Sequence, residues 1–151
     1  MCRYAMTNYK KHYACFACRK QFRRRLRSEQ PHLANKPDAP ARCPQCRLLM
    51  ADMGLDFKPP PTTDEKAWEL VGKLYEVGLT FHSCGCGGPG YRPRDARAYQ
   101  TFLQHTLDGY KETLRRWMDG TPRNAKEQHN KEEAIATWRA RIATVESALR
   151  A

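Results

Sequence analysis

The chain has 151 residues, of which 40% are hydrophobic and 28% are charged, and its net charge is +11. A chain of this size can form one ordinary domain, or a small domain with an appendage, and it contains no apolar stretch long enough to predict a membrane-spanning helix. The sequence does not open with the uninterrupted apolar region of a signal peptide. We therefore expect no membrane partner and a cytoplasmic location, or a nuclear one if the source is eukaryotic.

Positive charge is concentrated in the first part of the chain. Residues 1–61 contain 13 Lys and Arg against 4 Asp and Glu, giving +9, whereas residues 62–93 carry −1 and residues 94–151 carry +3. An excess of this kind suits a polyanionic partner, although charge alone does not identify the partner.

Four cysteines form two C-x-x-C pairs, Cys15 with Cys18 and Cys43 with Cys46, and 24 residues separate the pairs. Two residues between thiols allow a tight turn to direct both sulfurs at one ion, so two such turns can complete a tetrahedral Cys₄ site. We predict one structural Zn²⁺ bound by these four residues. A redox role is the alternative, but redox C-x-x-C motifs occur in a βαβ context that this region lacks.

Through these cysteines the chain resembles the zinc-ribbon proteins over about residues 13–58. The resemblance implies two knuckles that hold one structural zinc under a small antiparallel sheet. It also implies a role in nucleic-acid machinery, either by contacting the nucleic acid or by docking protein subunits.

The segment after the first cysteine pair is strongly basic and alternates like a strand. Over residues 20–27 the alternation places Phe22 and Leu26 on one face, with Arg24 between them, and we expect this face to be buried. The other face then presents Arg23, Arg25 and Arg27 in a row. The planar guanidinium of arginine can donate two parallel hydrogen bonds to phosphate. The candidate phosphate-binding residues are Lys10, Lys11, Arg19, Lys20, Arg23, Arg24, Arg25 and Arg27.

Aromatic residues near this basic segment, Tyr9, Tyr13 and Phe16, are candidates for stacking on bases. RNA or single strands are favoured over sequence-specific duplex reading, because no recognition-helix motif is evident. The alternative is that the charges form a solvated surface and bind nothing.

A proline-rich stretch marks the end of the cysteine-containing region. Residues 28–42 hold three prolines and predict an exposed loop, and residues 59–61 are all proline, which predicts a stiff spacer. A helix is expected directly afterwards, because Thr62 and Glu65 form a capping-box pattern and Gly78 is well placed as its C-terminal stop.

Residues 79–83 predict a strand, which leads into a glycine-rich loop with an H-x-C-x-C motif formed by His82, Cys84 and Cys86. Three ligands fall short of the four that a closed zinc site needs, so packing in a tight turn is favoured over a second metal site. A reactive thiol with a histidine base is a further alternative, but no orienting acid is placed by a recognisable pattern.

The same loop is a candidate anion site, because consecutive glycines expose backbone N–H groups and a helix N-terminus follows. No Gly-Lys-Ser/Thr follows the turn, so it is not a P-loop. The equally favoured alternative is that the glycines let the backbone pass close to neighbouring structure. The candidate anion-binding residues are Gly85, Gly87, Gly88, Arg92 and Arg94.

The remainder of the chain predicts two helices with a/d heptad seams. The first seam runs from Tyr99 to Trp117 and the second from Ile135 to Leu149, with a break at residues 119–122. A short Gly/Pro turn between two seams predicts an antiparallel helical hairpin.

The sequence therefore predicts an α+β protein in three parts. Residues 1–58 form a Cys₄ zinc-ribbon module, residues 59–93 provide a proline linker, helix, strand and Gly-rich loop packed on it, and residues 94–151 form the hairpin. The favoured function is a zinc-stabilised, non-enzymatic protein that binds nucleic acid or associates with ribonucleoprotein. One alternative is an interaction adaptor that docks the ribbon and hairpin onto a larger protein complex. A second is a thiol- and histidine-dependent enzyme centred on the H-x-C-x-C loop.

Overall fold

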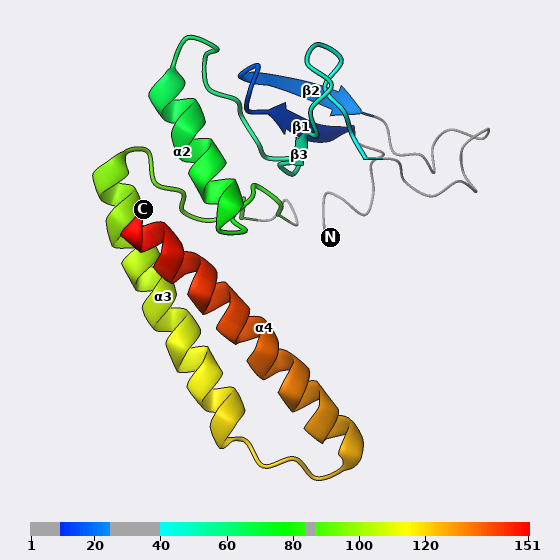
Figure 1. Ribbon diagram of the computed structural model, residues 1–151, viewed down its shortest axis with the longest axis vertical. Coiled ribbons are helices and arrows are strands. Elements are labelled where there is room, and N and C mark those ends of the chain that lie inside the picture. Colours follow the sequence, from blue (N-terminus) through cyan, green and yellow to red (C-terminus); the bar gives the residue numbers. More distant parts are fainter. Residues whose placement is uncertain (1–9, 25–39, 84–86) are drawn as a thin grey trace, which may run out of the picture. The chain divides into compact units, whose positions relative to one another are not determined.

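The computed structural model describes residues 10–24, 40–83 and 87–151 (Figure 1). Within these residues the fold is α+β, with a three-stranded antiparallel sheet and three helices, two of which form a C-terminal pair. The chain divides into two compact units, Met1–Arg92 and Pro93–Ala151. In the described part of the chain, no helix combines the length and the apolar character needed to cross a membrane.

The sheet has the order β2-β1-β3, so the central strand β1 (Lys11–Cys15) pairs with β2 (Lys20–Arg24) and with the short β3 (Ala51–Asp52). Both pairings are antiparallel. β2 is an edge strand and begins at Lys20, as predicted. The rest of the predicted strand, with Arg25 and Arg27, lies outside the described residues. Most of the predicted loop at residues 28–42 also lies outside them.

The pairing register identifies which face of the sheet is buried. Ala14 pairs with Ala51, and both side chains belong to the core, with exposures of 0% and 4%. Tyr13 pairs with Phe22 on β2, and residues directly opposite in an antiparallel pair share a face. Because Tyr13 and Ala14 alternate, Phe22 lies on the face away from this core and is only partly buried. The expectation that the Phe22 face is the buried one is wrong.

The core of the first unit is small and rich in aromatic rings. Ala14, Ala51, Met53, Phe57, Trp68 and Val71 form it, with Phe16 and Phe81 packed against its edge. The ring of Trp68 meets Phe57 and Phe16 edge-on, with centroid separations of 6.3 and 6.5 Å. Phe16, a candidate for base stacking, is therefore engaged in internal packing.

Helix α2 (Glu65–Glu76) begins two residues later than the predicted capping box. The N-cap is Asp64, whose carboxylate accepts a hydrogen bond from the Ala67 N–H at 3.0 Å. The helix cannot begin at Thr62, because Thr62 and Thr63 form a turn in which the Asp64 N–H donates to the Pro61 carbonyl. The predicted stop at Gly78 is confirmed, because this residue has a φ of +79°.

The end of α2 is a Schellman motif. The Gly78 N–H donates to the Tyr75 carbonyl and the Leu79 N–H donates to the Leu74 carbonyl, each at 2.9 Å. Trp68, Val71 and Leu74 form the buried face of the helix.

The predicted strand at residues 79–83 does not form; the segment lies beside residues 53–56 with two backbone hydrogen bonds. The Phe81 N–H donates to Met53 at 2.8 Å, and the Asp56 N–H donates to Phe81 at 3.2 Å. Gly54 permits this approach, because its φ is +86° and an added Cβ would lie 2.4 Å from the His82 nitrogen. The turn at Gly54 bends the partner chain away, which prevents a longer ladder.

The second unit consists of α3 (Ala96–Asp119) and α4 (Ala125–Arg150), which run antiparallel as the seams predict (Figure 1). Asp95 and Asn124 cap them, each accepting a hydrogen bond from a first-turn backbone N–H. The interior side chains of this unit are Tyr99, Leu103, Leu107 and Val145, all at most 5% exposed. The rings of Tyr110 and Trp138 pack at 5.2 Å further along the seam.

Candidate metal centre and basic surface

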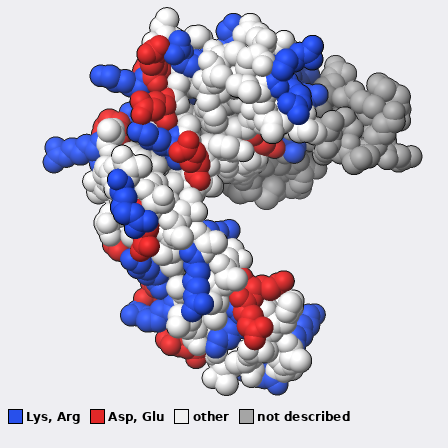
Figure 2. Space-filling view, viewed as in Figure 1, with Lys and Arg blue, Asp and Glu red and all other residues white. Residues whose placement is uncertain are grey.

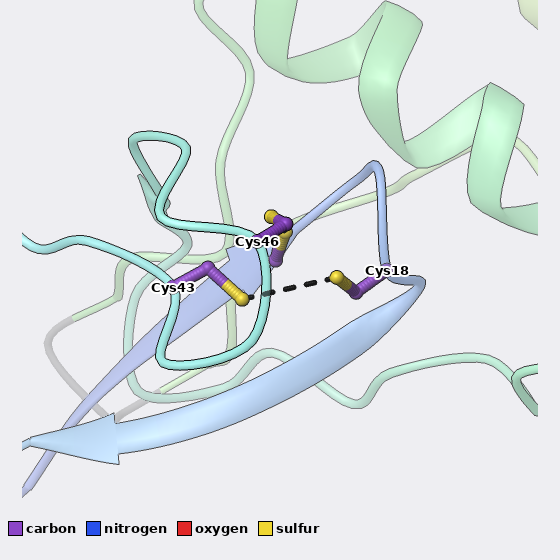
Figure 3. Close-up of side chains that lie close together, drawn as sticks. Cys18, Cys43 and Cys46 are labelled. Carbon is purple, nitrogen blue, oxygen red and sulfur yellow. Dashed lines mark hydrogen bonds between the residues drawn. The ribbon is translucent and has the colours of Figure 1, made fainter.

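The four cysteines of the two C-x-x-C pairs form one cluster, in which every Sγ lies within 4.8 Å of the others. The Sγ atoms of Cys15 and Cys46 are 3.5 Å apart. Those of Cys18 and Cys43 are 3.9 Å apart (Figure 3). Four sulfurs placed tetrahedrally at about 2.3 Å from a central ion would be separated by about 3.8 Å. The cluster therefore has the dimensions of a four-thiolate metal site, and all four residues are free thiols.

Each pair occupies a tight turn, here called a hook. The first hook is the turn between β1 and β2, and the second lies between Arg42 and Leu49, which form an isolated bridge. Arg19 and Arg47 directly follow the second cysteine of their hooks and have φ values of +52° and +64°. This left-handed conformation usually favours glycine, so no local sequence signal predicted it.

Hydrogen bonds and burial give the thiols different pKa values. The neighbouring Cys46 thiol and burial raise the pKa of Cys18 to about 12, and burial raises the pKa of Cys15. Burial would also raise the pKa of Cys43, but hydrogen bonds from the backbone N–H groups of Cys46 and Gln45 more than offset it and lower this pKa to about 7. A bound cation must therefore displace protons from the cluster.

The surroundings of the cluster suit a closed site. Cys15 and Cys43 are 1% and 0% exposed, and the Gln45 N–H lies 3.4 Å from the Cys43 sulfur. Four protein sulfurs would fill all positions of a tetrahedral ion and leave none for water or substrate. Such a site stabilises structure.

The predicted phosphate-binding residues fall into three groups. Lys10, Lys20, Arg23 and Arg24 are exposed. Lys11 and Arg19 are ion-paired, with Asp52 at 3.3 Å and with Glu65 at 2.6 Å. Arg25 and Arg27 lie outside the described residues.

Two basic residues at the second hook, Arg42 and Arg47, were missed by sequence reasoning. Both are exposed, and the Arg42 guanidinium donates to the Arg47 carbonyl at 3.2 Å. The sequence contains a signal for them, because an arginine stands on each side of the second cysteine pair in RCPQCR.

Charge is unevenly distributed over the first unit (Figure 2). Basic side chains gather over the end of β2, whereas acidic side chains gather over α2 together with the exposed Lys66 and Lys73. The exposed acids at the helix are Asp64, Glu65, Glu69 and Glu76. The end of β2 therefore presents positive charge, whereas α2 presents charges of both signs.

The structure places part of the H-x-C-x-C motif. His82 is exposed, with Nε2 3.3 Å from an Asp52 carboxylate oxygen and Nδ1 2.7 Å from the Thr80 hydroxyl. Cys84 and Cys86 lie outside the described residues.

Of the candidate anion site, Gly87, Gly88 and Arg94 are exposed, and Gly85 lies outside the described residues. Arg92 donates from Nε to the Thr80 carbonyl at 3.1 Å, and its guanidinium lies 5.7 Å from the Phe81 ring centroid. Its donors are directed toward the protein.

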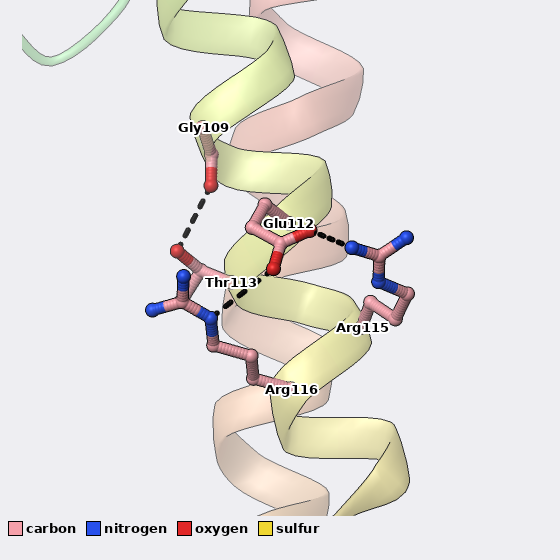
Figure 4. Close-up of polar contacts among 5 residues, drawn as sticks. All are labelled: Gly109, Glu112, Thr113, Arg115 and Arg116. Carbon is pink, nitrogen blue, oxygen red and sulfur yellow. Dashed lines mark hydrogen bonds and ion pairs between the residues drawn. The ribbon is translucent and has the colours of Figure 1, made fainter.

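In the hairpin, Arg115 and Arg116 both pair with Glu112, and Thr113 donates to the Gly109 carbonyl (Figure 4). An open pocket of about 290 Å³ lies at the tip of the hairpin, bordered by Trp117, Pro122 and Lys131 among others. The Lys131 ammonium already donates to the carbonyls of Met118 and Gly120 at 2.8 and 2.9 Å.

Comparison of the chain with protein-family models, with curated protein sequences and with solved structures finds no match.

Proposed function

We propose that the first unit is a zinc-ribbon-like module, stabilised by one Zn²⁺ at Cys15, Cys18, Cys43 and Cys46, that binds nucleic acid without catalysing a reaction. The observation that carries the proposal is the position of the exposed cations. Exposed Arg42 and Arg47 flank the second hook, and exposed Lys20, Arg23 and Arg24 follow the first. The exposed acids of the described first unit lie at α2, where exposed Lys66 and Lys73 partly balance them.

Zinc is the ion that this ligand set suits best, because thiolates are soft ligands and Zn²⁺ prefers tetrahedral sulfur coordination. Thiolate coordination also suits a reducing compartment such as the cytoplasm or nucleus. Native mass spectrometry should find one zinc per chain, and none after Cys18 and Cys43 are replaced by serine. A metal-free protein with unchanged amide protection would contradict the proposal.

Nucleic acid is the partner that the β2 edge suits best. Lys20, Arg23 and Arg24 are exposed on an edge strand whose first residues are anchored by the first hook. Guanidinium groups on a rigid element lose less conformational freedom when they bind phosphate. RNA or single strands remain the favoured ligands, since the described helices carry no recognition-helix pattern.

The test is affinity for a single-stranded RNA oligomer as a function of salt. Replacing Lys20, Arg23 and Arg24 by alanine should weaken binding and reduce the log–log salt slope by about 2, using about 0.7 per lost phosphate contact. The matched control removes three exposed charges elsewhere, with Lys58, Lys66 and Lys126 replaced by alanine. Equal slopes for the two triple variants, or no binding by the wild type at low salt, would overturn the proposal.

A second candidate function, a protein-interaction adaptor, is favoured by two exposed leucines that follow the second hook. Leu48 and Leu49 are 56% and 63% exposed. Replacing both by serine should abolish a stable protein complex if the hook docks onto a protein. The same variant should leave RNA binding unchanged if the basic edge is the functional surface.

A further inference from the structure

The outer face of the β1–β2 hairpin has an aromatic residue set between two cations on one strand. Phe22 is the central residue of β2, and Lys20 and Arg24 stand two residues before and after it. Residues two apart on a strand share a face, so all three lie on the side away from Ala14 and the core. Tyr13 on β1 lies directly opposite Phe22 on the same face.

Phe22 is not needed to fill the core. The aromatic side chains in or against the core are Phe16, Phe57, Trp68 and Phe81, which meet one another at 5.2 to 6.5 Å. Within the described residues, the ring of Phe22 takes part in none of these aromatic pairs, and its side chain is partly exposed. A partly exposed phenylalanine on an edge strand is costly for solubility, and here it is flanked by positive charge.

From this arrangement we infer that the outer face of the hairpin is a stacking platform for unpaired bases, with Phe22 as the principal ring and Tyr13 beside it. The inference rests on the proposed function and specifies the ligand as single-stranded nucleic acid. Phe22 stacks on a base, while Lys20 and Arg24 contact phosphates on either side of it.

The physical case for single strands is that a ring can stack only on a base whose face is exposed. The two cations are about 13 Å apart along the strand, at about 3.3 Å per residue. That distance allows them to reach different phosphates of an extended strand. A duplex would satisfy the cations but would leave the ring without a partner, because its base faces are already stacked on one another.

The ring and the cations contribute differently to RNA affinity, and the salt dependence of binding distinguishes the two contributions. Phe22→Leu should weaken binding of a single-stranded RNA by roughly 5- to 150-fold, the range for one lost base–aromatic stack. The salt slope should be unchanged, because no phosphate contact is lost. Phe22→Trp should restore the affinity. The matched control is Tyr91→Leu, which removes an aromatic ring that is 65% exposed elsewhere in this unit and should have no effect.

A ligand change makes the test independent of any variant's folding. Wild-type protein should bind an oligomer of abasic nucleotides at least as weakly as Phe22→Leu binds normal RNA, because the abasic oligomer offers no base to either ring. Wild type and Phe22→Leu should bind the abasic oligomer with similar affinity. Metal content of each variant, measured by native mass spectrometry, reports whether the hooks are intact.

Three outcomes overturn the platform. The first is unchanged RNA affinity of Phe22→Leu, the second is equal binding of normal and abasic oligomers, and the third is equal binding of a single strand and its duplex. If the Lys20, Arg23 and Arg24 variant still loses affinity in those cases, the proposed nucleic-acid function survives without the platform. Failure of the wild type to bind any of these oligomers would overturn both.

Discussion

The first unit contains, in its described residues, strands of five, five and two residues and a helix of 12, whereas the second unit consists of helices of 24 and 26 residues. Short strands without a large sheet are marginal in water, and a two-stranded hairpin is not stable alone. Long capped helices that share an apolar seam hold much of their stability locally. The comparison suggests that only the first unit depends on its cysteine cluster for folding.

The cluster is suited to supply what the short elements lack. It joins the β1–β2 turn to a segment 25 or more residues further along, as the Cys18–Cys43 contact shows. A structural zinc site contributes about 10–16 kcal/mol of apparent binding free energy in small peptides, comparable with the net stability of a whole domain, about 5–15 kcal/mol. The second unit has no cysteine at all.

The largest expected effect follows from removing the metal. A strong chelator, or replacement of Cys18 and Cys43 by serine, should unfold the first unit, because about 10–16 kcal/mol of binding free energy is lost. Hydrogen exchange measured by mass spectrometry should show loss of protection in β1, β2 and α2, with protection retained in α3 and α4.

Ala17→Ser, a change inside the first hook that leaves all four thiols, is the control for this experiment, since Ala17 is exposed. Loss of protection in both units together would break the comparison, because it would mean that the hairpin also depends on the metal.

The next effect compares one core side chain from each unit. Phe57 is 2% exposed and Leu103 is 0% exposed. Phe57→Ala should cost about 3–5 kcal/mol and Leu103→Ala about 2–5 kcal/mol, through lost burial and the cavity left behind. Denaturant unfolding followed by hydrogen exchange should assign each loss to its own unit. A loss of protection that spreads equally over both units in either variant would show that they fold as one.

Acidification should act on the first unit alone. Metal binding keeps the thiols ionised, so their pKa values are depressed in the metal-bound state, and the stability that the metal supplies is present at high pH and lost as the pH falls. In the folded cluster without metal, Cys18 has a pKa of about 12 and holds its proton from pH 8 to 5, whereas Cys43, with a pKa of about 7, takes up a proton as the pH falls through that range. If the metal-free unit unfolds, Cys18 has the ordinary thiol pKa of about 8.5 and is still mainly protonated over this range. The displaced Cys18 proton alone makes metal affinity fall about tenfold per pH unit.

Isothermal titration calorimetry in buffers of different ionisation enthalpy would count the protons released on metal binding. A count below one at pH 7 would contradict the assignment of Cys18 as a protonated thiol in the metal-free cluster. The helical content of α3 and α4 should change little over the same pH range, because their ion pairs, such as Lys111–Glu146, lie at the surface.

Features that depend on the spacing of neighbouring residues were predictable from the sequence. The matched C-x-x-C pairs predicted the cluster, because a fixed spacing constrains a turn that any surrounding fold must accommodate. The seams and the break at residues 119–122 predicted the helical pair, and Gly78 predicted the end of α2, because only glycine adopts its φ at low cost.

Features set by tertiary packing were not predictable in the same way. Alternation shows that Phe22 and Arg24 share a face, but not which face meets the core, and the register with Ala14 decides that. Residues 79–83 have the composition of a strand, but the turn at Gly54 bends away their pairing partner. The left-handed conformation of Arg47 is imposed by the hook and has no signal in the residue type.

The smallest effect gives the sharpest comparison, because the same local change can be made in each unit. Asp64 caps α2 and Asn124 caps α4, each by accepting one backbone hydrogen bond at 3.0 and 2.9 Å. Replacing either by alanine should cost about 1 kcal/mol of local stability. If the metal-free first unit is unfolded, metal binding must also fold it, so any loss of its folding free energy reduces the observed binding free energy by the same amount. A loss of about 1 kcal/mol in Asp64→Ala should therefore weaken metal affinity about fivefold. Asn124→Ala should leave metal affinity unchanged while lowering hydrogen-exchange protection at the start of α4.

Competition with a chelator of known affinity measures the metal affinity of both variants. An equal loss of metal affinity in both variants would show that folding of the hairpin is coupled to the cysteine cluster, and no loss in either would show that the first unit is already folded when the metal arrives.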